Sequence, residues 1–385
     1  MEMPFFFVTL ALPKLLSLGN EQKSFLFFFF SLDFSYLCNM DELFFTILQA
    51  ELWQKPIGNI SLTPQQAKDF IEEAKKQSVA GLFCNSLVHH DIPIGKEYTL
   101  KALAIVKKVT KENKKRNFDV AHFCRFFQRH NIPFVIVKGQ SVAALYPHPD
   151  LRQSGDIDVF CGQNHFVEAR EQIAQKTDLQ FDPAIPVKHL AFSIDGSKYE
   201  LHRILSIFSY PPNQQFFNEK MEEALVRHDE IEIDGVKVPV LAPTDSIFFQ
   251  VVHIFYHIIK EGIGLRQLCD LAIFMHATQE RVDFDELQSN LKKIGLEEFF
   301  QAIMSILVDQ LGLTLRISGF TPRTSTLANK ILKDINDGGN FGRALEENRI
   351  LIILRHYIKY LPDATKEILY IPYEKFTRKK RGLTS

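Results

Sequence analysis

The stretch from Pro133 to Cys161, PFVIVKGQSVAALYPHPDLRQSGDIDVFC, constrains the fold of this chain more than any other. Its apolar run Pro133–Val137 is typical of a buried strand, and Lys138-Gly139-Gln140-Ser141 predicts a tight turn. A short helix is expected over Ser141–Tyr146, followed by a loop with Pro and His residues and by a second strand. The sequence therefore predicts a strand, a turn, a helix, a loop and a strand in close succession.

The second strand carries two acidic side chains, Asp156 and Asp158. Residues two apart on a strand share a face, so both carboxylates point the same way while Ile157 and Val159 face the core. Adjacent carboxylates repel each other, and a fold tolerates them most easily with a cation between them. The pair predicts a cation site, because the apolar neighbours and flanking Gly155 disfavour two plain solvated residues.

A third carboxylate, Glu200, lies in the segment SKYELHRIL. Glu200 shares a strand face with His202, which we interpret as a structural histidine; a plain surface role is the alternative for Glu200. If this strand neighbours the one with Asp156, three carboxylates converge, which suits Mg²⁺. Two such ions about 4 Å apart would clamp the attacking and leaving oxygens of a phosphoryl transfer.

The turn before the short helix predicts a phosphate site. Free backbone N–H groups and the helix dipole favour an anion around Gly139 and Ser141, and glycine allows a phosphate to approach closely. Lys138 and Arg152 are expected to supply positive charge.

Residues 40–130 are predicted to be helical. Thr63-Pro64-Gln65-Gln66 has the pattern of a helix start, with a capping Thr and Pro at the first helical position. The apolar spacing predicts one uninterrupted helix through AKDFIEEAKKQSVAGLFCNSL, and a long helix over Tyr98–His130. The basic run Lys107–Arg116 within it is interpreted as a solvated face rather than a nucleic-acid site.

Residues 131–240 combine helix with strands. A helix is expected from about Asn164 to Lys176, and two hairpins over Leu190–Ile204 and Glu230–Leu241. The dipeptides Asp195-Gly196 and Asp234-Gly235 between apolar runs are strong hairpin signals. The pattern predicts a compact α+β unit with a mixed sheet.

Residues 241–385 return to helix. His253 and His257 lie four apart on one helix face, and hydrogen bonding in a core or interface is favoured over metal binding for them. Arg266 and Asp270 are also four apart, and the spacing predicts that they pair with each other. The basic tail Arg378–Arg381 is expected to be loose.

The first 39 residues hold nine of the 35 phenylalanines. They lack a basic start and a cleavage site of a signal peptide, and Phe25–Phe30 is too short to cross a bilayer. We interpret residues 1–39 as a non-native or disordered extension read from a misplaced start codon ahead of Met40. A hydrophobic membrane anchor is the alternative.

The composition is that of an ordinary globular protein: 385 residues, 46% hydrophobic, with a formal net charge of −1. This charge gives no indication of a nucleic-acid or membrane partner. The five cysteines are scattered without a CxxC pair, which disfavours disulfides and zinc sites and fits a cytoplasmic location.

The Gly-x-Ser turn, the GDIDVF strand and the later strand glutamate resemble the nucleotidyltransferase superfamily typified by DNA polymerase β. More narrowly, VKGQSVAALYPHPDLRQSGDIDVF, YELHRIL and GLRQLCDLA resemble its bacterial "uncharacterised nucleotidyltransferase" family over roughly residues 40–370. The resemblance implies an α+β fold: a small mixed-sheet nucleotidyltransferase core at 131–240, flanked by helical domains at 40–130 and 241–385.

The resemblance also implies a reaction. Asp156, Asp158 and Glu200 would bind Mg²⁺, two ions being expected, and act in catalysis. The residues expected to bind the nucleotide are Lys138, Gly139, Ser141, Arg152, Ser154 and Gly155. The enzyme would transfer a nucleoside monophosphate from an NTP to a hydroxyl acceptor and release pyrophosphate. The alternatives are a non-catalytic nucleotide- or protein-binding module, like one half of a toxin–antitoxin pair, and a D-x-D glycosyltransferase.

Overall fold

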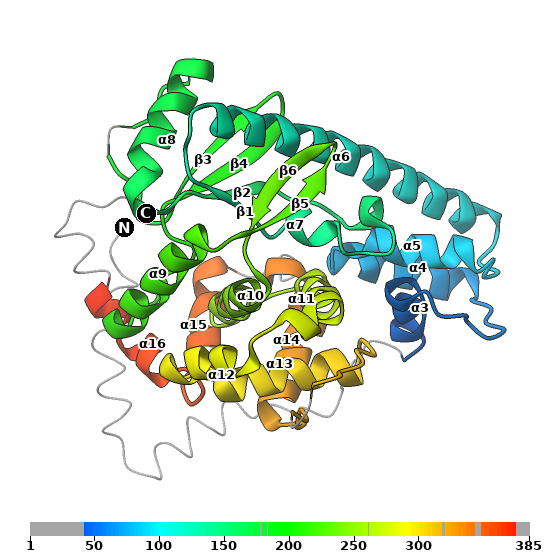
Figure 1. Cartoon of the computed structure of the whole chain (residues 1–385). Coiled ribbons are helices and arrows are strands. Elements are labelled where there is room, and N and C mark those ends of the chain that lie inside the picture. The colour runs from blue at the N-terminus through cyan, green and yellow to red at the C-terminus, as the bar shows by residue number, and fades with distance from the viewer. Residues whose placement is uncertain are drawn as a thin grey trace, which may run out of the picture.

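A computed structural model describes residues 42–177, 179–182, 184–260, 262–317, 320–342 and 348–374. The expectations for residues 1–39 and for the basic tail at 378–381 lie outside the described residues. Within them the chain forms one six-stranded sheet with helices on both faces (Figure 1). The predicted fold class, an α+β protein with a mixed sheet and helical flanks, is confirmed; the domain boundaries stay a prediction.

The sheet has the strand order β3-β4-β2-β1-β6-β5. Its strands are β1 (Val135–Val137), β2 (Ile157–Phe160), β3 (His189–Ile194), β4 (Ser197–His202), β5 (Asp229–Ile233) and β6 (Val236–Val240). The pairs β2/β4 and β1/β6 are parallel, and the other neighbours are antiparallel. Both predicted hairpins are present, and their Asp-Gly turns have the positive φ angles that such turns require.

Side chains alternate along the central strands as the pattern predicted. Ile157 and Val159 of β2 belong to a buried cluster on one face of the sheet, together with Phe123 and Phe127. These two phenylalanines come from α6 (Lys96–Arg129), the long helix that runs along this face in Figure 1. Phe160, on the opposite side of β2, packs into a second and larger cluster. The two aspartates consequently face that second side.

The N-terminal helices are α3 (Glu42–Trp53), α4 (Pro64–Lys76), α5 (Ala80–His89) and α6. The predicted capping box at Thr63 is present. The prediction of one continuous helix from residue 64 to 87 is wrong, because the chain breaks at Ser78, whose φ is 58°. The adjacent Gln77 donates its side-chain N–H to Ile335 O and accepts from Leu265 N, so tertiary hydrogen bonds fix the break.

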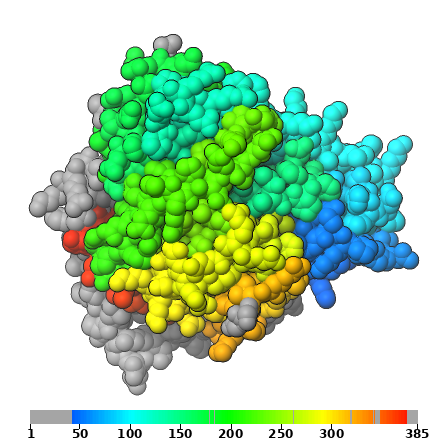
Figure 2. All heavy atoms as spheres, viewed as in Figure 1, coloured from blue at the N-terminus to red at the C-terminus, as the bar shows by residue number. Residues whose placement is uncertain are grey.

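The remaining helices are α7 (Gln140–Ala143), α8 (Gly162–Thr177), α9 (Pro211–Val226), α10 (Pro243–Ile258), α11 (Leu265–Thr278), α12 (Phe284–Lys293), α13 (Glu297–Asp309), α14 (Thr326–Gly338), α15 (Arg349–Tyr360) and α16 (Thr365–Leu369). Of these, α8 shares the first face with α6 through Phe166, Ala169 and Ile173, and the others cover the second face and the ends of the sheet (Figure 1). The larger buried cluster joins the N-terminal helices to α10, α11 and α13. In Figure 2 the N-terminal helices, in blue and cyan, adjoin the C-terminal ones in yellow and orange. No described helix is both long and apolar enough to span a bilayer.

Candidate active site

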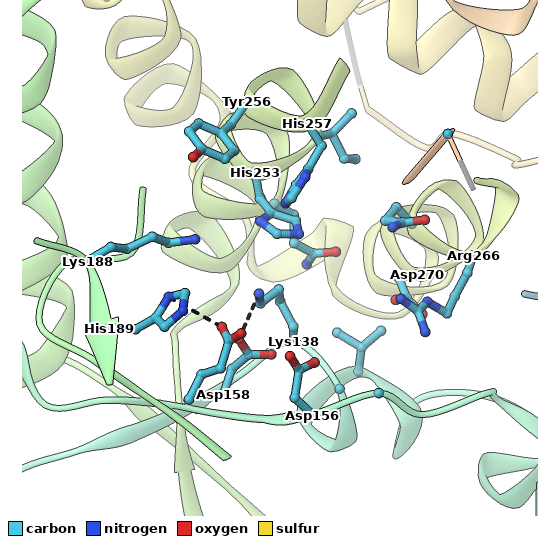
Figure 3. A pocket seen from close by; sticks show the side chains of 18 of the residues that line it. Lys138, Asp156, Asp158, Lys188, His189, His253, Tyr256, His257, Arg266 and Asp270 are labelled. Atoms are coloured by element: carbon cyan, nitrogen blue, oxygen red, sulfur yellow. Dashed lines mark ion pairs between the residues drawn. The ribbon is translucent and has the colours of Figure 1, made fainter. Parts of the chain in front are cut away.

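A cavity of about 620 Å³ lies between the sheet and the helices α10 and α11. Its sheet side is formed by the β1–α7 turn, β2 and β4, and its helical side by α10 and α11 (Figure 3). The charged side chains that line it are Lys138, Arg152, Asp156, Asp158, Lys188, Glu200, Arg266, Asp270 and Arg349. A pocket with this mixture of cations and carboxylates can take an anion and its counter-cation together.

The parallel pairing of β2 and β4 brings the three predicted acids together. Asp158 is the direct partner of Glu200 in the register of these strands. Asp156, one residue before β2, lines the same cavity. The strand that carries Glu200 is therefore a neighbour of the aspartate strand, as the predicted convergence of the three carboxylates requires.

Lys138 lies among these acids (Figure 3). Its Nζ is 2.9 Å from Asp158 Oδ1. Lys138 and Gly139 both have positive φ angles, 57° and 47°, and the left-handed region is unfavourable for a lysine. Burial works against the charge of Lys138, yet the carboxylates of Asp158, Asp156 and Glu200 raise its pKa above the ordinary value. The turn thus holds a buried ammonium group against the acidic cluster.

The three acids differ in how easily they ionise. Burial, reinforced by the charges of Asp158 and Glu200, raises the pKa of Asp156. Burial also acts on Asp158, but Lys138 and the hydrogen bond from His202 hold the pKa of Asp158 well below its usual range. Glu200 behaves in the same way, since its contact with His202 outweighs burial and lowers the pKa of Glu200. Asp158 and Glu200 are therefore ionised at neutral pH.

Two histidines surround Glu200. His202 is fully buried; its Nε2 lies 2.8 Å from Asp158 Oδ1 and 3.3 Å from Glu200 Oε2. The hydrogen bonding predicted for a structural histidine is present at Nε2 only, because the buried Nδ1 has no hydrogen-bond partner among the described residues, and both partners of Nε2 are candidate site residues. His189 was not singled out from the sequence, although the hairpin register that places it opposite His202 follows from the predicted Asp-Gly turn. Burial lowers the pKa of His189 to about 4, so its imidazole is neutral at pH 7.

Arg152 and Asp270 form a buried ion pair. Arg152 Nε and Nη2 each lie 2.6 Å from one oxygen of Asp270, and Tyr146 donates its hydroxyl to the same carboxylate at 2.8 Å. The predicted pairing of Asp270 with Arg266 is wrong, because Asp270 pairs with an arginine from a distant segment. Arg266 instead donates to Gln153 O and lines the cavity.

The remaining predicted nucleotide-binding residues lie around the β1–α7 turn. Ser141 donates its hydroxyl to Lys138 O, and the Ser154 hydroxyl lies within hydrogen-bond distance of two acceptors, Asn113 Oδ1 and Gln140 Oε1. Gly139 and Gly155 line the cavity. The helix α7 covers only four residues, Gln140–Ala143, rather than the expected six. Both serine hydroxyls therefore stabilise the turn itself in this structure.

The helical wall opposite the acids consists of His253, Tyr256 and His257 from α10, with Lys188 beside Tyr256 (Figure 3). The Lys188 ammonium lies 5.4 Å from the centre of the Tyr256 ring. Burial, together with the positive charge of Lys138, lowers the pKa of His253 far below its ordinary value, so His253 is neutral. Lys188 and Tyr256 were not predicted, because no local motif marks them.

The family model described as "Uncharacterised nucleotidyltransferase" matches residues 63–312. No curated protein matches. One similar solved structure is an antigenic nucleotidyltransferase-like protein from Paracoccidioides brasiliensis, with 14% sequence identity and a TM-score of 0.31. That match covers 52% of this chain and 94% of the other. Because the family model spans more than half of the sequence, this chain belongs to the uncharacterised nucleotidyltransferase family.

Proposed function

We propose that this protein is a metal-dependent nucleotidyltransferase, which transfers a nucleoside monophosphate from an NTP to a hydroxyl acceptor and releases pyrophosphate. The observation that carries the proposal is the register of β2 and β4, with Asp158 opposite Glu200 and Asp156 lining the same cavity. Membership of the nucleotidyltransferase family supports it.

The donor set fits Mg²⁺. Asp156, Asp158 and Glu200 offer carboxylate oxygens, the ligands that this hard cation prefers. A cationic group, the Lys138 ammonium, already lies 2.9 Å from Asp158, so the cluster accommodates positive charge. The three acids would hold the metal, two ions being expected; when bound, the metal neutralises charge on the triphosphate and on the developing transition state.

The cationic side chains of the cavity would bind the triphosphate. Lys138 and Arg266 line the cavity near Asp156, and Lys188 lines it next to His189, at the start of β3 (Figure 3). We expected Arg152 to contact phosphate. Both of its hydrogen bonds to Asp270 are made inside the protein, so we instead assign Arg152 a positioning role. Ser141 and Ser154 would keep the turn closed around Gly139 and Gly155.

Glu200 would accept the proton of the acceptor hydroxyl. In this step the hydroxyl oxygen bonds to the α-phosphorus, the bond to the bridging oxygen breaks, and pyrophosphate leaves with the electron pair. His202 would fix the direction of the Glu200 carboxylate through its Nε2 contact. Positioning and charge neutralisation would supply most of the rate gain, as in phosphoryl transfer generally.

One observation favours the alternative of a non-catalytic binding module. Lys138 already neutralises Asp158, so the acidic cluster does not require a metal to be stable. The presence of all three acids in one cavity favours catalysis instead. A D-x-D glycosyltransferase has no such support, since the described elements of residues 42–130 are helices rather than a strand–helix nucleotide-binding unit.

Calorimetric titration with each of the four NTPs, with and without Mg²⁺, tests the proposal. We expect Mg²⁺-dependent binding of at least one NTP, and loss of that binding in the Asp156→Asn/Asp158→Asn double variant. Asp195→Asn/Asp234→Asn is the matched control, because both residues lie in exposed hairpin turns where asparagine tolerates a positive φ. If folded wild-type protein binds no NTP, or if the double variant binds as well as wild type, the proposal is wrong.

A further inference from the structure

A group of nitrogen and oxygen donors lies beside the three carboxylates, on the β3–β4 hairpin. His189, Glu200 and His202 each offer one ligand atom, and these atoms lie within 4.8 Å of one another. His189 Nδ1 is 3.5 Å from Glu200 Oε2, and His202 Nε2 is 3.3 Å from the same oxygen. The antiparallel register, which pairs His189 with His202 and leaves Glu200 two residues away on the same face, creates this group.

The two distances from Glu200 Oε2 to the histidine nitrogens, 3.5 and 3.3 Å, are close to those in a tetrahedral metal site. With metal–nitrogen distances of about 2.0–2.1 Å, neighbouring donors in such a site are roughly 3.3 Å apart. In addition, the buried His189 Nδ1 has no hydrogen-bond partner among the described residues, although it faces the Glu200 carboxylate. Two electron-rich atoms that face each other without a shared proton are stabilised by a cation between them.

We propose that His189, Glu200 and His202 form a binding site for a transition-metal ion. Among the common biological ions apart from copper, Zn²⁺ is expected to bind most tightly to this site. Two imidazoles and one carboxylate suit Zn²⁺ and its first-row neighbours, whereas Mg²⁺ takes oxygen ligands. The site differs from the all-carboxylate site proposed above by its two imidazole donors, and the two sites share Glu200. A transition-metal ion bound here therefore competes with the nucleotide-associated metal for that carboxylate.

The present hydrogen bonds limit the affinity of this site. The Nε2 of His202 lies 2.8 Å from Asp158 Oδ1, and a carboxylate can only accept, so Nε2 carries the proton. To bind a metal through Nε2, His202 must carry its proton on Nδ1, which is buried without a hydrogen-bond partner among the described residues. Metal-binding histidines normally donate from the second nitrogen. We therefore expect micromolar binding of Zn²⁺ rather than the affinity of a closed structural site.

Calorimetric titration of the full chain with Zn²⁺ tests this proposal, in excess Mg²⁺ and without nucleotide. We expect a component of one Zn²⁺ per chain that weakens at least tenfold in His189→Gln, the more exposed of the two histidines. His202→Gln should lose the same component. The matched control, His122→Gln/His130→Gln, removes an exposed histidine of α6 and the exposed histidine that follows this helix, and it should bind like wild type. All variants contain the same five cysteines, so thiol binding cancels in the comparison.

Unaltered Zn²⁺ binding by folded His189→Gln would overturn the proposal, and so would the absence of micromolar binding by wild type. A thermal melt establishes folding for each variant. The outcome is independent of the nucleotidyltransferase proposal, because the Mg²⁺–NTP titration of wild type uses no transition metal. Loss of one result with preservation of the other identifies which proposal fails.

Discussion

Lys138 Nζ and Asp158 Oδ1 lie 2.9 Å apart in the centre of the candidate site. The lysine is presented by a turn with two successive positive φ angles, and the aspartate by a central strand. The ammonium thus takes the place next to Asp158 that the proposed mechanism assigns to a metal ion. Metal binding and the Lys138–Asp158 pair are expected to exclude each other, which releases Lys138 toward the triphosphate.

Lys138→Met is expected to destabilise the metal-free protein and to strengthen Mg²⁺ binding. The substitution leaves buried carboxylates without their cation, a change that costs about 3 kcal/mol in comparable cases. Added Mg²⁺ should restore much of this loss, because the ion replaces the missing charge. Urea unfolding with and without Mg²⁺ measures both effects.

The control for this experiment is Lys108→Met on the exposed surface of α6. Lys108 pairs with Glu112 at 3.9 Å, with a side chain that is 75% exposed. Its loss should change the free energy of unfolding by less than about 1 kcal/mol, independently of Mg²⁺. Equal stability of Lys138→Met and wild type in metal-free buffer would show that the buried ammonium does not stabilise the acids.

Asp158→Asn is expected to abolish turnover while the overall fold persists. Asparagine has nearly the same shape as aspartate, but it lacks the full negative charge with which a carboxylate holds a divalent cation. Release of pyrophosphate from an NTP, measured with a set of hydroxyl acceptors, and circular dichroism provide the two readouts. Full activity of Asp158→Asn in the presence of Mg²⁺ would contradict the proposed mechanism.

Much of the site follows from local sequence patterns. The alternation in GDIDVF places Asp156 and Asp158 on one side, and the Asp-Gly turn of the β3–β4 hairpin sets which face Glu200 occupies. These are short-range rules, and the structure agrees with them. What they leave open is which strands are neighbours, and the β2–β4 pairing decided that the three acids converge.

The two predictions that the structure contradicts, one of a helix and one of an ion pair, fail because long-range contacts override the local pattern. The helix break at Ser78 depends on hydrogen bonds from Gln77 to residues near 265 and 335, which no window of local sequence contains. The spacing of Arg266 and Asp270 predicts an ion pair within one helix, but the distant Arg152 offers Asp270 two parallel bonds in a buried position. A bidentate buried pair is stronger than a pair on a helix surface.

Asp270→Asn is expected to lower the free energy of unfolding by about 3–5 kcal/mol, because it leaves the buried Arg152 guanidinium without its carboxylate. Asp229→Asn, which removes an ion pair with the exposed Arg281, should cost less than about 1 kcal/mol and is the control. Urea unfolding of both variants makes the comparison. A small effect of Asp270→Asn would indicate that Arg152 is free to turn toward a phosphate, as first expected.

His253 is expected to make the protein less stable as the pH falls below about 6.5. Burial and the charge of Lys138 lower the pKa of His253 in the folded protein, whereas the unfolded chain binds a proton there near pH 6.5. Below that pH the unfolded state holds the extra proton, so the free energy of unfolding decreases by up to about 1.4 kcal/mol per pH unit.

His253→Phe should remove this part of the pH dependence, since phenylalanine keeps a ring beside Phe249 and His257 but does not titrate. Urea unfolding in metal-free buffer, from pH 7 to about two pH units lower, measures how the free energy of unfolding changes with pH. The proteins compared are wild type, His253→Phe and the exposed control His122→Phe. The control should keep the slope of wild type, because it replaces a histidine on the exposed surface of α6, away from the cavity. Equal slopes for wild type and His253→Phe would contradict this prediction, because they would mean that His253 binds a proton as readily in the folded protein as in the unfolded chain.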